Sequence, residues 1–190
     1  MGTNSIKKPA VFLDRDGTII FDKNYLKSPV QVKLYSYAAE SINKLRAAGF
    51  KIIVVTNQSG IRRGIFTEKD LQDINEKFLF MLEKKGAKID SLYYCPHVDS
   101  DNCSCRKPKT GMVLQGAKDF NIDLSKSYTV GDSIRDYLLG FNMGGKGILI
   151  LTGQGKKHQS NLAKEKVKPF AICKNLKQAV NFIVKDVKNN

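Results

Sequence analysis

Residues 12–19 read FLDRDGTI, and the interpretation of the whole chain starts from this stretch. The apolar run 10–13 gives way to two carboxylates, Asp14 and Asp16, and then to Gly17, as expected of a buried strand that ends in a turn. Ligands of parallel α/β sheets bind in the crevice beyond the carboxyl ends of the strands. We therefore expect both carboxylates to face a functional site, where such close negative charges favour a hard divalent cation. For an isolated pair, an Asx turn with a helix-capping aspartate is the competing interpretation.

Strand-like and helix-like segments alternate along the rest of the chain. Apolar runs of strand length lie at 51–55, 91–94, 127–130 and 147–151, a shorter one lies at 170–172, and helical apolar spacing occurs at 37–48, 71–85, 110–120 and 176–187. This alternation predicts a three-layer, Rossmann-like α/β fold with a mostly parallel sheet and right-handed crossovers. With 190 residues the chain is long enough for one well-buried core, so we expect a single domain over residues 1–190.

The chain is strongly basic, with 32 Lys and Arg residues against 18 Asp and Glu residues and a formal net charge of +14. Such a charge predicts an anionic partner but does not distinguish phosphate esters from nucleic acids or acidic membranes. Few aromatic residues lie between the C-terminal lysines, which favours a solvated surface over a nucleic-acid interface. The N-terminus lacks the apolar core of a secretory signal, and no apolar run is long enough to span a bilayer, so we expect a cytoplasmic protein.

Three of the four cysteines lie within eleven residues, together with one of the two histidines: Cys95, His97, Cys103 and Cys105. In a reducing compartment such a cluster indicates metal ligation rather than disulfides. One imidazole and three thiolates suit a closed tetrahedral Zn²⁺ site, with no open position for catalysis. We therefore predict a structural zinc that folds the loop 95–105; buried thiols with an incidental histidine are the alternative. Cys173, in an apolar run, is interpreted as a small core residue.

Polar residues also follow other predicted strands, or the zinc loop itself: Thr56 and Asn57, then Arg106 and Lys107, then Asp132 and Asp136. Each group alone is explained equally well by a turn or a helix cap. Together with the opening carboxylates, they provide acids, a hydroxyl, an amide and cations at separate strand ends. These are the parts of a phosphoryl-transfer site, which needs a metal, a nucleophile and positive charge around the transferred phosphate.

The order of these motifs resembles the haloacid dehalogenase superfamily of phosphatases, whose first motif is D-x-D-G-T. The resemblance implies that Asp14 attacks phosphorus to form an aspartyl-phosphate, and that Asp16 protonates the leaving oxygen and then activates water. It also implies that Mg²⁺ is held by Asp14, by the backbone carbonyl of Asp16 and by Asp132. Thr56 and Lys107 would stabilise the phosphoryl group.

Within the superfamily, LDRDGT at 13–18, TNQSG at 56–60, IRRGIFTE at 61–68, the zinc loop and CRKP at 105–108 resemble the D-glycero-D-manno-heptose 1,7-bisphosphate phosphatases. These enzymes lack a large cap domain and remove the 7-phosphate on the way to the nucleotide-activated heptose of lipopolysaccharide and other surface polysaccharides. The resemblance implies a small sugar phosphate as substrate, no nucleic-acid or membrane partner, and a monomer. The residues implied to bind substrate are Asp22, Tyr25, Asn57, Gln58, Ser59, Arg63, Arg106 and Ser133.

Two positions depart from the family pattern, and three other functions share parts of it. Ser133 stands where the family commonly has Lys, and Asp22-Lys23-Asn24-Tyr25 stands where it has Asp-His-Gly-Tyr. The five-residue gap between His97 and Cys103 also occurs in histidinol-phosphate phosphatases. A polynucleotide 3′-phosphatase would share the motifs and suit the basic charge, and a non-catalytic, zinc-stabilised binding module is the alternative from another class.

Overall fold

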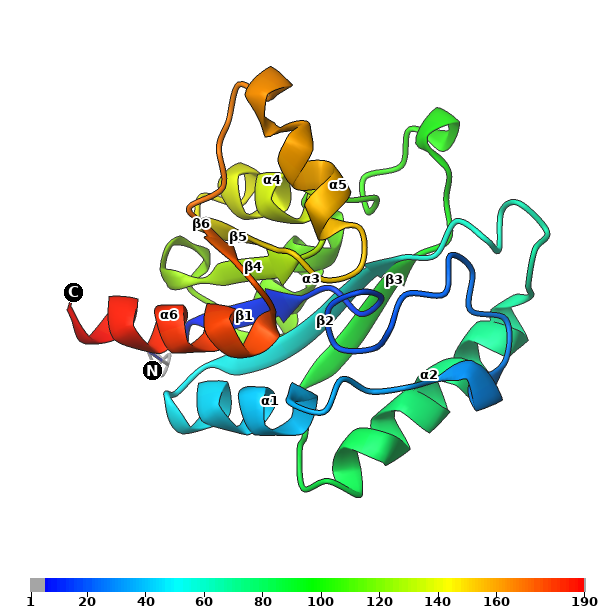
Figure 1. Ribbon diagram of the computed structural model, residues 1–190, viewed down its shortest axis with the longest axis horizontal. Coiled ribbons are helices and arrows are strands. Elements are labelled where there is room, and N and C mark those ends of the chain that lie inside the picture. The colour runs from blue at the N-terminus through cyan, green and yellow to red at the C-terminus, as the bar shows by residue number, and fades with distance from the viewer. Residues whose placement is uncertain (1–5, 190) are drawn as a thin grey trace, which may run out of the picture.

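A six-stranded sheet runs through the middle of the protein in the order β3-β2-β1-β4-β5-β6, and every neighbouring pair of strands is parallel (Figure 1). The computed structural model describes residues 6–189. Its strands are β1 (Ala10–Leu13), β2 (Lys51–Asn57), β3 (Ser91–Cys95), β4 (Tyr128–Gly131), β5 (Lys146–Ile150) and β6 (Ala171–Cys173). The predicted mostly parallel sheet is confirmed, and within the described residues it is entirely parallel.

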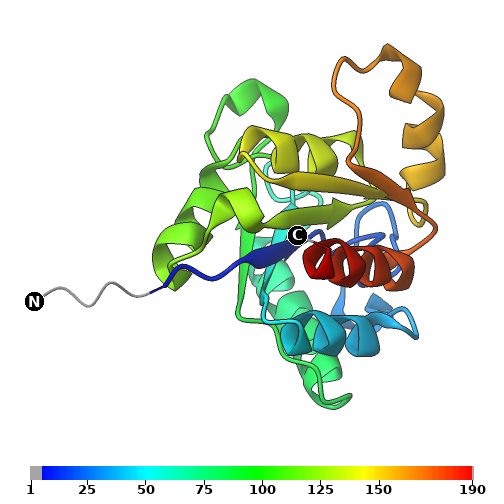
Figure 2. The same ribbon diagram turned by 90° about the vertical axis from the view of Figure 1, so that its left-hand side faces the viewer.

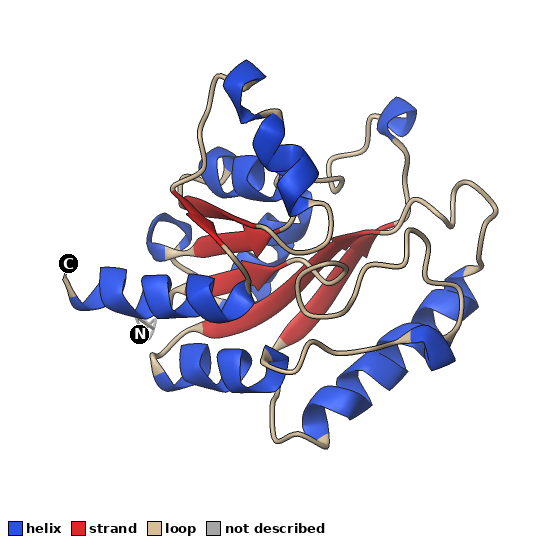
Figure 3. Cartoon of the chain, in the orientation of Figure 1, coloured by secondary structure: helices blue, strands red, loops and turns tan. Residues whose placement is uncertain are grey.

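Helices cover both faces of this sheet, so the fold has the three predicted layers (Figures 2 and 3). The main helices are α1 (Ala38–Ala47), α2 (Glu68–Glu83), α3 (Gly111–Phe120), α4 (Ile134–Asn142) and α6 (Leu176–Lys188). Successive strand side chains point to opposite faces. Val11 and Leu13 accordingly share a core with α1, α2 and α6, whereas Ala10 and Phe12 pack in a second core with α3 and α4. Cys173 is buried in the first of these cores, as predicted.

Local sequence signals account for the start of α2 but not for the short helix α5 (Gly155–Ser160). Thr67 is the N-cap of α2, because its hydroxyl accepts a hydrogen bond from the backbone of Asp70 while the Asp70 carboxylate accepts one from Thr67. Residues 155–160 read GKKHQS and contain no apolar stripe, so the sequence predicts no helix there. This undetected helix borders the site described below.

The functional edge of the sheet is set by the pairing of its three central strands. Leu13 of β1 lies opposite Val54 of β2 and Val130 of β4. Because these strands are parallel, their carboxyl ends meet at one edge of the sheet. Asp14, Thr56 and Asp132 therefore lie at the same edge, although they are far apart in the sequence.

Within residues 6–189, no helix has both the length and the apolar character needed to cross a membrane. The N-terminal segment that we interpreted as lacking a secretory signal includes residues 1–5, which lie outside the described residues. The cytoplasmic location remains a prediction from sequence.

Candidate active site

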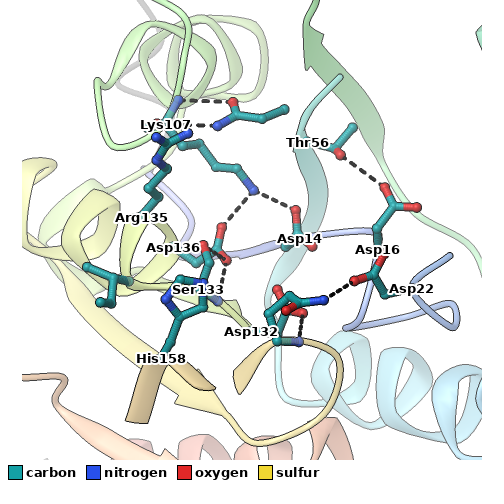
Figure 4. Close-up of a pocket in the computed structure, with 13 residues that line it drawn as sticks. Asp14, Asp16, Asp22, Thr56, Lys107, Asp132, Ser133, Arg135, Asp136 and His158 are labelled. Carbon is teal, nitrogen blue, oxygen red and sulfur yellow. Dashed lines mark hydrogen bonds and ion pairs between the residues drawn. The ribbon is translucent and has the colours of Figure 1, made fainter. Parts of the chain in front are cut away.

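A cavity of about 490 Å³ opens at the carboxyl ends of β1, β2 and β4 (Figure 4). Its walls come from the turn after β1, the end of β2, the segment after the cysteine cluster, the start of α4 and the start of α5. The lining residues are Asp14, Asp16, Asp22, Thr56, Asn57, Lys107, Asp132, Ser133, Ile134, Arg135, Asp136, Gln154 and His158. The structure thus brings all four candidate catalytic residues, together with Asp132, to one cavity.

Lys107 is the central cation of this cavity and is almost completely buried. Its Nζ lies 2.6 Å from Oδ1 of Asp14 and 2.7 Å from Oδ1 of Asp136, and it donates a hydrogen bond of 2.8 Å to the carbonyl of Val55. Burial opposes its charge, but the carboxylates of Asp136 and Asp14 outweigh this effect and raise the pKa of Lys107. Lys107 is therefore a permanent ammonium that fixes the position of the Asp14 carboxylate.

Three buried carboxylates, which together form the acidic cluster of the site, surround this one ammonium. Asp14, Asp132 and Asp136 each place an oxygen within 4.8 Å of the others. Burial raises the pKa of Asp14 to about 7, against the opposing effect of Lys107. Burial, followed by the nearby carboxylates of Asp14 and Asp136, raises the pKa of Asp132 to about 8. A compact set of oxygen donors with more negative than positive charge fits a hard divalent cation such as Mg²⁺.

The raised pKa of Asp132 predicts that this residue destabilises the protein when no divalent cation is bound. A folded-state pKa of about 8 means that the folded protein holds this proton more tightly than the unfolded chain, so ionisation costs stability progressively between about pH 4 and pH 8. We expect Asp132→Asn to raise the free energy of unfolding at pH 8 by about 1–2 kcal/mol without Mg²⁺, and by less at pH 6. Urea denaturation in magnesium-free buffer measures this difference.

Added Mg²⁺ provides the control for the Asp132 prediction. Mg²⁺ should stabilise the parent protein at pH 8, because a ligand that binds only the folded state shifts the unfolding equilibrium. The Asn variant should respond much less. A variant that is less stable than the parent at pH 8 would contradict the proposed electrostatic cost.

The Asp132 carboxylate is held between two glycines. Its Oδ2 accepts a hydrogen bond of 2.7 Å from the backbone of Gln154. A Cβ atom would lie 2.1 Å from this oxygen at Gly17 and 1.9 Å from it at Gly153. Both glycines have positive φ angles, 77° and 49°. These positions are therefore closed to side chains, and the close backbone approach orients Asp132 toward Asp14.

This packing predicts that Gly153→Ala damages the site beyond its backbone strain. The new methyl group must displace the Asp132 carboxylate, so we expect kcat to fall by about 10- to 100-fold and the Mg²⁺ concentration for half-maximal activity to rise. Gly144→Ala is the matched control, because Gly144 also has a positive φ, 77°, but a methyl group there would meet no neighbouring group within 4 Å. Similar losses of activity in both variants would show that strain, not displacement of Asp132, is responsible.

Asp16 faces away from Lys107 and does not add its carboxylate to the acidic cluster (Figure 4). Its oxygens pair with Arg15, whose Nη2 lies 2.9 Å from Oδ2, and the same oxygen accepts a hydrogen bond of 2.9 Å from Nε2 of Gln58. The Thr56 hydroxyl lies 3.5 Å from it. Arg15 is fully buried and is held in turn by Asn75 of α2, at 2.6 Å. The Asp16 carboxylate is therefore fixed at the cavity wall, separate from the carboxylates of Asp14, Asp132 and Asp136.

Asp136 links the start of α4 to Lys107. Its Oδ2 accepts hydrogen bonds from the backbone and the hydroxyl of Ser133, at 3.0 and 2.7 Å, which caps the helix. Its Oδ1 pairs with Lys107. Ser133, predicted to contact substrate, lines the cavity while serving as this cap.

The predicted zinc ligands lie together at the end of β3 and in the loop that follows. The three Sγ atoms are 3.1 to 3.6 Å apart, and Nδ1 of His97 lies 3.4 Å from Sγ of Cys105 and 3.6 Å from Sγ of Cys95. Donors at such separations fit the corners of a tetrahedron around an ion with bonds of about 2.0–2.3 Å. The four side chains thus fit a closed Zn²⁺ site.

The other residues predicted to bind substrate occupy different places. Asp22 and Asn57 line the main cavity. Tyr25, Gln58 and Ser59 line an adjoining cavity of about 110 Å³, which shares Asp16 and Asn57 with the main one.

The two predicted arginines lie outside the main cavity. Arg106 donates hydrogen bonds of 2.9 Å to Asp99 and to the carbonyl of His97, so in this structure it braces the zinc loop. Arg63 is exposed and lines none of the cavities described here.

Sequence reasoning missed three polar residues of the cavity wall: Arg135, Gln154 and His158. Gln154 holds Asp132 through its backbone and Asp22 through its side chain, at 2.9 Å. The signal that could have found Gln154 was its position just after the fifth strand, because polar groups at that end of a parallel sheet face the same crevice. Nothing local distinguishes Arg135 or His158 from the many other basic residues.

Family models match most of the chain. One described as polynucleotide kinase 3 phosphatase matches residues 9–137, and one described as HAD-hydrolase-like matches residues 104–179. The first contains every residue of the acidic cluster and both residues of the Arg106–Lys107 pair. The two models together extend over the catalytic motifs and the C-terminal strands.

Two relatives that align over most of the chain are named for the same activity. The chain is 35% identical over 175 residues to the D-glycero-beta-D-manno-heptose-1,7-bisphosphate 7-phosphatase of Helicobacter pylori strain J99, covering 92% of this chain and 96% of the relative. The enzyme of the same name from Pasteurella multocida strain Pm70 is 39% identical over 172 residues, covering 84% and 93%. The crystal structure of D,D-heptose 1,7-bisphosphate phosphatase from B. bronchiseptica complexed with magnesium and phosphate superposes with a TM-score of 0.84 at 31% identity, covering 94% and 99%.

Proposed function

The chain belongs to the D,D-heptose 1,7-bisphosphate 7-phosphatase family of the haloacid dehalogenase superfamily, and we propose that it hydrolyses the 7-phosphate of D-glycero-D-manno-heptose 1,7-bisphosphate. Its product would enter the synthesis of nucleotide-activated heptose for lipopolysaccharide or another surface polysaccharide. The main support is similarity at 35% identity over 96% of a relative with that name. The polynucleotide phosphatase model, by contrast, matches only the region of the shared motifs.

In the first half of the proposed reaction, the Asp14 carboxylate attacks phosphorus. A P–O bond to Asp14 forms while the P–O bond to the sugar C7 oxygen breaks. Asp16, at the cavity wall, transfers its proton to that leaving oxygen. Lys107 and the Thr56 hydroxyl stabilise the negative charge on the transferred phosphoryl group. Covalent capture on Asp14 divides one difficult displacement into two easier steps.

In the second half, water displaces Asp14 from phosphorus. Asp16 now accepts a proton from the water, whose oxygen forms the new P–O bond. The Asp14–phosphorus bond breaks, which returns the Asp14 carboxylate and releases inorganic phosphate. Lys107 remains an ammonium throughout, so its contacts with Asp14 and Asp136 keep the nucleophile in place between the two steps.

Both metals belong to this proposal. Mg²⁺ would be held by Asp14, Asp132 and the backbone carbonyl of Asp16, and it would supply positive charge to the phosphoryl oxygens. The raised pKa values of Asp14 and Asp132 support this assignment, because a cation would relieve the burial of both carboxylates. Zn²⁺ would be held by the cysteine and histidine cluster and would act structurally. Its function would be to hold the segment that ends in Arg106 and Lys107.

Tyr25, Asn57 and Ser59 are proposed contacts for sugar hydroxyl groups, because they line the space next to Asp16.

We propose that residues 1–190 form one phosphatase domain that acts as a cytoplasmic monomer, for which the support is the sequence alone.

A panel of phosphate esters tests the function directly. Purified protein with Mg²⁺ is assayed for phosphate release from heptose 1,7-bisphosphate, histidinol phosphate and a 3′-phosphorylated oligonucleotide. We expect kcat/KM for the heptose bisphosphate to exceed the other two by at least about 100-fold. A preference for histidinol phosphate or the oligonucleotide would replace the proposed function with the corresponding alternative.

A further inference from the structure

A bisphosphate substrate presents a second anion, and the main cavity offers one cation for it. The need for a second anion site rests on the proposed function. Lys107 and Arg135 are the only Lys and Arg residues among the described lining residues. Lys107 is enclosed by Asp14, Asp136 and the carbonyl of Val55. Arg135 remains, on the first turn of α4 beside Lys107, on the side of the cavity opposite Asp16 (Figure 4).

Arg135 and Arg106 share a single carboxylate. Nη2 of Arg135 lies 3.0 Å from Oδ2 of Asp99, and Nε of Arg106 lies 2.9 Å from Oδ1 of the same residue. The hydrogen bonds from Arg106 and Arg135 hold the pKa of Asp99 below its usual range. The Asp99 side chain is 64% exposed, so the surrounding structure does not lock it in this position. Two guanidinium groups thus converge on one exposed carboxylate, beside the part of the main cavity wall that Arg135 forms.

The arginines differ in how firmly they are held. Arg106 is 10% exposed, and its Nη1 also donates to the carbonyl of His97, so its position is fixed by the zinc loop. Arg135 is 42% exposed, and within residues 6–189 its ion-pair partner is Asp99 alone. Two cations against one carboxylate leave an excess of positive charge. A phosphate dianion balances that charge better than a carboxylate and accepts hydrogen bonds from both guanidinium groups.

We propose that Arg135 determines specificity for bisphosphates, by binding with Arg106 the phosphate that stays on the sugar, and that Asp99 occupies this anion position when substrate is absent. Substrate binding then exchanges one anion for another, with no change in the buried Lys107 cluster. Arg135 acts in binding only, because it contacts neither Asp14 nor Asp16.

Steady-state kinetics with two substrates tests this proposal. Heptose 1,7-bisphosphate carries the second phosphate, whereas 4-nitrophenyl phosphate does not. We expect Arg135→Ala to raise KM for the bisphosphate by about 10- to 100-fold, with kcat and the KM for 4-nitrophenyl phosphate changed less than about threefold. Asp99→Asn should lower KM for the bisphosphate severalfold, because it removes the competing carboxylate, and should leave the aryl ester unaffected.

Arg62→Ala is the matched control. Arg62 makes a similar ion pair with another carboxylate of the zinc loop, at 3.4 Å from Asp101, and lines none of the cavities described here. Its kinetics should equal those of the parent. Equal changes for both substrates in Arg135→Ala, or no change for either, would overturn the proposal. A parent protein inactive on the bisphosphate would instead refute the proposed function, so the two failures are distinguishable.

Discussion

Asp14→Asn is expected to lower kcat by about 10⁴-fold or more, because the amide that replaces the carboxylate cannot form the covalent intermediate. The loss should be in kcat rather than in folding. Lys107 keeps its ion pair with Asp136 in the variant, and removal of a buried carboxylate whose pKa is raised to about 7 does not cost stability near neutral pH. Phosphate release under saturating Mg²⁺ and thermal unfolding measure the two quantities.

Direct detection of the intermediate strengthens this test. Asp16→Asn should slow attack by water more than capture of an aryl phosphate, because 4-nitrophenolate leaves without a proton. Acid-quenched Asp16→Asn protein should therefore carry a phosphoryl group on the peptide that contains Asp14, as mass spectrometry would detect. Asp22→Asn changes another carboxylate of the same cavity that does not contact Lys107, and its loss of kcat should be far smaller. Activity of Asp14→Asn within about tenfold of the parent, or phosphate on a different residue, would refute Asp14 as the nucleophile.

The sequence predicted those parts of the site that depend on position along a strand. Asp14 and Asp132 directly follow β1 and β4, and Thr56 lies near the end of β2, so the parallel sheet alone brings them together. The cysteine cluster was equally predictable, because its donors lie within eleven residues and a single loop can bring them together. The first prediction needs one global rule about the sheet, whereas the second follows from local sequence alone.

Interactions between side chains from different segments could not be predicted in this way. Asp136 was among the polar residues expected at the strand ends, but its pairing with Lys107 joins two segments that are far apart in the sequence. The contact between Arg106 and Asp99 could not be predicted either, because no local pattern relates the two residues. The prediction that Arg106 binds substrate is untested by this contact. The position of Gln154 after the fifth strand was the only signal for it: the helix that follows has no apolar periodicity, and its contact with Asp132 is made by the backbone, whose N–H carries no side-chain signal.

Loss of the proposed zinc is expected to damage both stability and catalysis. Cys105→Ser removes one of four ligands, and structural zinc contributes about 10–16 kcal/mol of apparent binding free energy in zinc-finger peptides. We expect zinc content to fall well below one equivalent and Tm to fall by about 10 °C or more. Metal analysis and thermal unfolding of the same preparation measure both. Cys173→Ser is the matched control, because Cys173 is a buried thiol on β6 outside the cluster, and this variant should retain its zinc.

The catalytic loss should follow from the position of Lys107, two residues after the last cysteine of the cluster. Asn57 holds the same segment from β2, through hydrogen bonds of 3.1 and 3.3 Å to the backbone of Lys107. With zinc lost, these bonds and the contacts of the Lys107 side chain would have to position an ammonium that must lie 2.6 Å from Asp14. Since displacement of a catalytic group by about 1 Å can cost about 100-fold in rate, we expect kcat of Cys105→Ser to fall by about that factor. Unchanged kcat in a zinc-free variant would show that the zinc loop does not position the catalytic lysine.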